Sequence, residues 1–178
     1  MSSRQQKIRL LTRTTRGRAA AASFLASLSE ALGEPIEASA LVSLPESDAL
    51  LEVFRNGYER AFGGEQVGHR AFCRAPEARR VFQVTDCLAD QTAGERVFLL
   101  AKLRTDCGAV VVDISLLLRH AASVISFDGD SLSAMSMGRT QGLLIDHNPD
   151  DIEQTYEVAV WGDRWSPLAR ACDSQDLT

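Results

Sequence analysis

The sequence lacks the motifs that identify the common nucleotide-binding and hydrolytic enzymes. It contains no Walker A loop, no G-x-G-x-x-G fingerprint and no G-x-S-x-G elbow around a serine. Its three histidines, His69, His120 and His147, have none of the spacings that metal ligands show. The sequence therefore predicts no catalytic residue and no cofactor.

Long apolar runs are also missing. No run approaches the roughly 20 residues that a membrane-spanning helix needs, so we expect no membrane segment. Residues 1–18 hold six basic residues and no acid, ahead of an alanine-rich run at 19–28, as in a secretory signal peptide. Serines interrupt that run, and its pattern continues as an amphipathic helix to a glycine C-cap at Gly33. We therefore favour an ordinary first helix in a cytoplasmic protein over a signal peptide.

Cysteine is scarce and dispersed. The four residues are Cys73, Cys87, Cys107 and Cys172, and no two form a C-x-x-C pair. This spacing favours a reducing compartment, although it does not exclude one disulfide. Cys87 and Cys107 lie in apolar surroundings, where we expect buried thiols.

Charge is distributed unevenly along the chain. The 178 residues carry a net charge of −5, but without the six basic residues of the N-terminus 13 basic residues face 24 acidic ones, a net charge of −11. An acidic protein surface of this kind favours binding to a basic partner and disfavours binding to nucleic acid. Solubility alone would also explain the excess of acidic residues. The basic segment has no aromatic residue to stack on bases, which favours a flexible arm over a nucleic-acid contact.

The length predicts one globular domain at residues 18–170, between a flexible basic arm at 1–17 and a tail at 171–178. A first helix is predicted at 18–32 and a second from Pro45 to the pair Gly63 and Gly64. Apolar residues at helical spacing mark the buried faces of both helices. They are Phe24, Leu25, Leu28 and Leu32 in the first, and Leu50, Leu51, Phe54, Tyr58 and Phe62 in the second.

Strand patterns dominate the rest of the chain. Residues 65–80 look like a basic loop, and strands are predicted at 81–84, 97–103 and 109–113. A helix is predicted at 114–122, and residues 124–127 fit either its continuation or a return strand. We therefore predict an α+β fold, with N-terminal helices packed on a mostly antiparallel sheet that ends in a C-terminal strand meander.

Acidic residues concentrate near the C-terminus. From Asp128 to Asp163 eight acidic residues accompany one basic residue, Arg139. The dipeptide Asp128-Gly129 predicts a hairpin turn. Six of these acids are candidates for contact with a partner: Asp128, Asp130, Asp146, Asp150, Asp151 and Glu153.

Two tryptophans follow in this region. Trp161 ends an apolar strand and is expected in the core. Trp165 stands near the chain end, before Pro167, and is the better candidate for a surface hot spot in partner binding.

Three segments of the acidic region are together similar to the C-terminal half of small bacterial immunity proteins. They are FDGD at 127–130, GLLID at 142–146 and YEVAVWG at 156–162, with RVFQVTD at 80–86 as a fourth candidate. Immunity proteins are encoded beside polymorphic or contact-dependent growth-inhibition toxins. The resemblance implies a non-enzymatic inhibitor that binds a cognate toxin domain, such as a basic nuclease, and occludes its active site. The acidic residues would then imitate phosphate charge and speed association.

Two alternatives remain. Asp128, Asp130, Asp146 and His147 could serve a small metal-dependent enzyme, but the further ligands and distal glutamate of a calcium loop are missing. The chain could also be a secretion-associated adaptor whose basic arm docks elsewhere.

Overall fold

The computed structural model describes residues 3–64, 67–101, 106–149 and 155–173. The α-helices are α1 (Ser3–Leu32), α2 (Leu44–Phe62), α3 (Ala75–Gln91), α4 (Ile114–Arg119), α5 (Ala121–Phe127) and α6 (Ser166–Asp173), with a 3-10 helix at Ala38–Ala40. The strands are β1 (Gly68–Arg74), β2 (Arg96–Leu99), β3 (Val110–Asp113), β4 (Ser131–Ser136), β5 (Gly142–Asn148) and β6 (Thr155–Trp161).

All six strands form one antiparallel sheet in the order β1-β6-β5-β4-β2-β3. The last three strands in sequence are neighbours in space, so the predicted C-terminal meander is confirmed. The five residues 137–141 form the turn that joins β4 to β5. The predicted α+β class, with helices packed on an antiparallel sheet, is correct.

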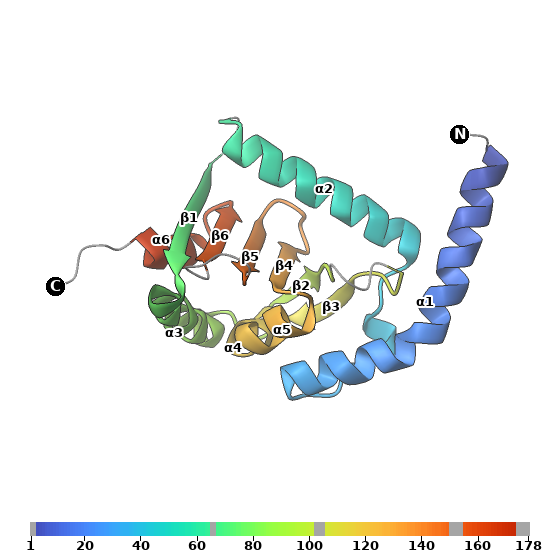
Figure 1. The fold of residues 1–178 in the computed structure, drawn as a ribbon, viewed down its shortest axis with the longest axis horizontal. Helices are drawn as coiled ribbons and strands as arrows, with labels where there is room; N and C mark the ends of the chain where they lie inside the picture. Colours follow the sequence, from blue (N-terminus) through green and yellow to red (C-terminus); the bar gives the residue numbers. More distant parts are fainter. Residues whose placement is uncertain (1–2, 65–66, 102–105, 150–154, 174–178) are drawn as a thin grey trace.

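Helices cover both faces of the sheet, and each face has its own apolar cluster (Figure 1). Among the described helices, α2 covers one face, where Leu50 and Phe54 pack with Phe98, Met135 and Trp161. The other face carries the larger cluster. Helices α3 to α6 and the C-terminal half of α1 pack there.

Helix α2 forms where its sequence signals predict it. The Ser43 hydroxyl accepts a hydrogen bond from the Glu46 amide (3.4 Å), Pro45 lies in the first turn, and the helix ends at Gly63. Helix α1 likewise ends before Gly33, whose φ of 71° suits a glycine C-cap. All four residues of its predicted apolar face are buried.

The basic segment at the N-terminus is helical rather than an unstructured arm. Helix α1 begins at Ser3, so the predicted boundary between an arm and a first helix at residue 18 is wrong. Arg13 ties this half of the helix to the body through Asp48 (2.9 Å) and Asp106 (3.3 Å). Figure 1 shows α1 changing direction along its length, with its first half beside the start of α2.

The prediction for residues 68–84 is also wrong. Residues 68–74 form edge strand β1, and the predicted strand at 81–84 lies inside helix α3. The buried positions of α3 show the reason: Ala78, Val81, Thr85 and Leu88 recur every three or four residues, as on one face of a helix. A window of four residues contains too little of this period to separate it from a strand.

Three smaller predictions are wrong in part. The Asp128-Gly129 turn joins helix α5 to β4 rather than two strands, and residues 124–127 continue as helix. Cys107 is buried as expected, but Cys87 is exposed on α3. Helix α6 extends through residue 173, so the first part of the predicted tail is helical, and the rest lies outside the described residues.

Candidate functional site

Two of the predicted acidic residues meet around one pocket at an end of the sheet. This acidic pocket holds about 370 Å³, and Asp130 and Asp146 line it together with Glu157. The other lining residues are Phe72, Gly129, His147, Asn148, Pro149 and Thr155. The pocket thus draws its carboxylates from the turn before β4, from β5 and from β6.

Strand register places these residues side by side. Asp146 on β5 pairs with Glu157 on β6, and Glu157 pairs in turn with Phe72 on β1. Cross-strand partners point to the same face of a sheet, here the face that α2 covers at its other end around Trp161. Phe72 is 60% exposed, so a large aromatic side chain stands in solvent beside the carboxylates.

Glu157 is held by two donors. The Tyr58 hydroxyl and the Arg70 Nε each donate to its Oε1 at 2.8 Å. The Arg70 guanidinium also lies over the ring of Phe72, 4.9 Å from its centroid, and near the rings of Tyr58 and Phe62. This cluster fixes Glu157 and Phe72 relative to each other.

The same contacts make Tyr58 a hydrogen-bond donor rather than a base. Burial, with the hydrogen bond to Glu157, raises the pKa of Tyr58 to about 12. The phenol therefore keeps its proton at neutral pH and cannot accept one from a substrate.

His147 also lines the pocket. Its ring stacks on Tyr156 with centroids 4.4 Å apart, and its Nδ1 lies 3.6 Å from an Asp130 carboxylate oxygen. Within the residues that the structure describes, no group of three or more His, Cys, Asp or Glu side chains is arranged to hold a metal ion. The His147 imidazole and the Asp130 carboxylate thus approach each other at the pocket wall.

The remaining candidate residues either lie away from the acidic pocket or fall outside the described residues. Asp128 is buried at the end of α5, with 1% of its surface exposed, and does not line the pocket. Trp165 is 2% exposed within the larger apolar cluster, so its predicted surface position is wrong, whereas Trp161 is in the core as expected. Asp150, Asp151 and Glu153 lie outside the described residues.

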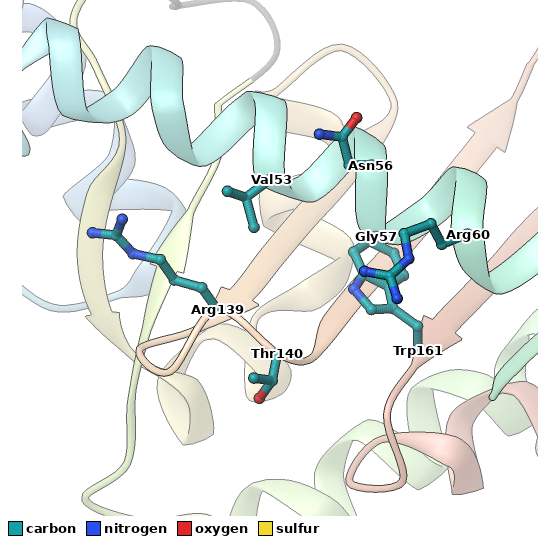
Figure 2. Close-up of a pocket in the computed structure, with 7 residues that line it drawn as sticks. All are labelled: Val53, Asn56, Gly57, Arg60, Arg139, Thr140 and Trp161. Carbon is teal, nitrogen blue, oxygen red and sulfur yellow. The ribbon is translucent and has the colours of Figure 1, made fainter. Parts of the chain in front are cut away.

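A second pocket, also about 370 Å³, lies between α2 and the β4–β5 turn (Figure 2). We call it the arginine pocket. Its lining residues are Val53, Asn56, Gly57, Arg60, Arg139, Thr140 and Trp161. Sequence reasoning missed it because α2, the turn and the end of β6 each supply part of the lining.

Arg139 has an unusual backbone conformation. It has a φ of 59°, a left-handed conformation that costs a residue with a Cβ about 1–2 kcal/mol and that glycine adopts freely. Its guanidinium reaches Glu46 on α2 (3.0 Å) and lies over Phe98, 5.9 Å from the ring centroid. These contacts offset part of the strain and join the turn to α2.

Within the described residues, no helix has the length and hydropathy to cross a membrane. A comparison of the chain with protein-family models, curated proteins and solved structures finds no match.

Proposed function

We propose that this chain is a protein-binding module that neutralises a basic partner domain, as an immunity protein neutralises its toxin. The observation that carries the proposal is the acidic pocket, where Asp130, Asp146 and Glu157 converge beside exposed Phe72. A lysine or arginine side chain of the partner enters this pocket and pairs with Asp130 and Asp146. Phe72 packs against apolar surface at its margin.

The arrangement has the two components of a protein interface. Exposed aromatic side chains supply contact area and are enriched in hot spots, and charged groups around them steer association. Asp130 keeps 45% of its side-chain surface exposed, so its carboxylate remains accessible to a cation.

The first test identifies the partner. Tagged protein serves as bait in extracts of the native organism, and mass spectrometry identifies what it retains. We expect one stoichiometric protein with a basic domain. Expression of that domain alone should arrest growth, and co-expression of this chain should restore it. A partner that is harmless to the cell would refute the immunity function.

The second test locates the interface. The double variant Asp130→Asn/Asp146→Asn should slow association with the captured domain by about tenfold at low salt and flatten its dependence on ionic strength. Asp86→Asn is the matched control, because Asp86 is exposed on α3, away from the pocket. Association rates equal to wild type in the double variant would remove the acidic pocket from the interface.

Deleting residues 1–12 separates this function from an adaptor role. The deletion removes the exposed basic start of α1 but keeps Arg13 and its contacts with Asp48 and Asp106. We expect partner affinity and growth rescue to survive. Loss of both in a folded protein would favour an adaptor that docks through its N-terminus.

A further inference from the structure

Strand β1 forms one edge of the sheet. It pairs with β6 on one side, and among the described residues no strand pairs with it on the other (Figure 1). The opposite edge differs, because Leu41 forms a bridge with Val110 on β3 and the Val42 amide donates to the Ala109 carbonyl at 2.9 Å. A strand whose backbone groups face outward at an edge is a template for pairing with another strand.

The pairing with β6 shows which backbone groups of β1 face this edge. The Gly162 amide donates to the Val67 carbonyl at 3.3 Å, so these two opposed residues form a hydrogen-bonded pair. Hydrogen-bonded and non-hydrogen-bonded pairs alternate along an antiparallel ladder. The amides and carbonyls of Gly68, Arg70 and Phe72 therefore point away from β6, toward the edge.

The side chains at this edge are complementary to those of a second copy of the chain. Phe72 is 60% exposed, and the Arg70 guanidinium lies over its ring, 4.9 Å from the centroid. If a second β1 pairs antiparallel about a two-fold axis at Ala71, each Arg70 lies opposite Phe72 of the other copy. A cation and an aromatic ring form a favourable cross-strand pair, and the symmetry makes this contact twice.

The neighbouring registers are unfavourable. Edge-facing residues must oppose each other, so the register changes only in steps of two residues. An axis at Arg70 would oppose the two Arg70 side chains, and an axis at Phe72 would oppose Arg70 and Arg74 of the two copies. Like charges directly opposite each other destabilise a strand pair. With the axis at Ala71, Arg74 lies opposite Gly68 instead.

From these observations we infer that β1 is a self-association edge, through which two copies of this chain pair antiparallel about Ala71 and join their sheets. The inference goes beyond the proposed function and does not rest on it. Phe72, Asp146 and Glu157 share one face of the sheet. Because the two-fold axis is perpendicular to the joined sheet, the two acidic pockets lie on the same face of the dimer.

The first test measures the association state of the full chain. Sedimentation equilibrium from about 1 to 200 µM should show a monomer–dimer equilibrium. Phe72→Arg places a guanidinium opposite Arg70 of the other copy and should weaken dimerisation at least about tenfold. The new arginine faces Glu157 within its own sheet, so we expect the variant to fold. Met137→Arg is the matched control, because Met137 is also an exposed apolar residue but lies in the β4–β5 turn.

Cysteine cross-linking tests the register. Arg70→Cys and Phe72→Cys are made separately in a Cys87→Ser/Cys172→Ser background, which retains Cys73 and Cys107, both buried. An equal mixture should give a disulfide-linked heterodimer on mild oxidation, since opposed residues of a hydrogen-bonded pair have Cα atoms about 5.5 Å apart.

The mixture also preserves one native contact. On the other side of the two-fold axis, Phe72 of the first variant still meets Arg70 of the second. Each variant alone loses both contacts and has no opposed cysteines, so it should cross-link far less than the mixture. The background protein without a new cysteine is the control for disulfides through the native thiols.

Several results would overturn the inference. They are a wild-type monomer up to about 200 µM, dimerisation of Phe72→Arg equal to wild type, loss of the dimer in Met137→Arg, and cross-linking of either single cysteine variant as strong as in the mixture. Far-UV circular dichroism and the urea midpoint confirm that each variant is folded. Because no other protein takes part, failure here leaves the immunity proposal to its own tests.

Discussion

At the scale of single residues, glycine decides how closely α2 approaches the sheet. The Trp161 ring lies between Gly57 on α2 and Gly142 on β5, and a Cβ at either position would collide with the indole. Gly142 is also the register partner of Trp161. The wall of the arginine pocket therefore depends on two residues that have no side chain.

The substitution Gly142→Ala tests this contact. The added methyl group must displace the indole, so we expect a loss of about 1–3 kcal/mol in the free energy of unfolding, measured by urea denaturation. Gly138→Ala in the adjoining turn is the control, because its Cβ would meet nothing closer than the Thr140 hydroxyl at 3.8 Å. Equal stability of the two variants would contradict the close packing of Trp161.

A second residue-scale prediction concerns Tyr58 at alkaline pH. Burial and the Glu157 hydrogen bond raise the pKa of Tyr58 from 10.0 to about 12 in the folded protein. Its stabilising effect is therefore fully present below pH 10 and is lost as the pH rises through about 12.

The variant Tyr58→Phe should remove this alkaline loss of stability. Urea midpoints measured at several pH values from neutral to alkaline should fall less steeply in the variant than in wild type. Tyr156→Phe keeps the Tyr58–Glu157 hydrogen bond and is the comparison variant: burial also raises the pKa of Tyr156, so this variant should lose only the Tyr156 part of the alkaline loss and retain the part that Tyr58 causes. Parallel curves for wild type and Tyr58→Phe would show that the hydrogen bond does not persist in solution.

At the scale of elements, the two halves of helix α1 differ in how far their apolar side chains are buried. Its C-terminal half buries Phe24, Leu28 and Leu32, whereas exposed Ile8 and Leu11 mark its first half. The contacts of Arg13 with Asp48 and Asp106 link that first half to the body. The order of this half therefore rests largely on polar contacts rather than on apolar burial.

The variant Arg13→Gln should loosen the first half of α1 without unfolding the protein. We expect faster amide hydrogen exchange in residues 5–12 and a loss of at most about 1 kcal/mol in global stability, because the ion pairs are partly exposed. Arg16→Gln, another exposed arginine on α1, should change neither. Unchanged exchange in Arg13→Gln would show that other contacts hold the helix.

At the scale of the whole molecule, one sheet joins two apolar clusters into a single domain. Trp161 belongs to the cluster under α2 and Trp165 to the cluster on the opposite face. Each tryptophan therefore reports on one side of the sheet.

Fluorescence of the single-tryptophan variants Trp161→Phe and Trp165→Phe tests this unity. In each variant, the urea transition seen by fluorescence should coincide with that seen by far-UV circular dichroism, as two-state unfolding requires. A tryptophan transition that precedes the loss of secondary structure would show that α2 and its face unfold separately.

Several elements could be predicted from local signals in the amino-acid sequence. Capping at Ser43 and Pro45 set the start of α2, Gly33 ended α1, and β-branched runs marked β3 and β6, because each depends on neighbouring residues alone. The sequence also identified the acidic region and two of the residues that line the acidic pocket. Part of helix α3 was predicted as a strand because the apolar run at 81–84 is too short to show the helical period.

Which side chains meet in each pocket depends on how the elements pack together. Strand order brought Phe72 beside Glu157 across 85 positions of sequence, and the end of α5 buried Asp128 while Asp130, two residues later, reached the pocket. The packing of α2 on the sheet likewise created the arginine pocket from three distant segments. Pockets and patches depend on non-local pairing, whose register is set by burial across the whole sheet rather than by any segment alone.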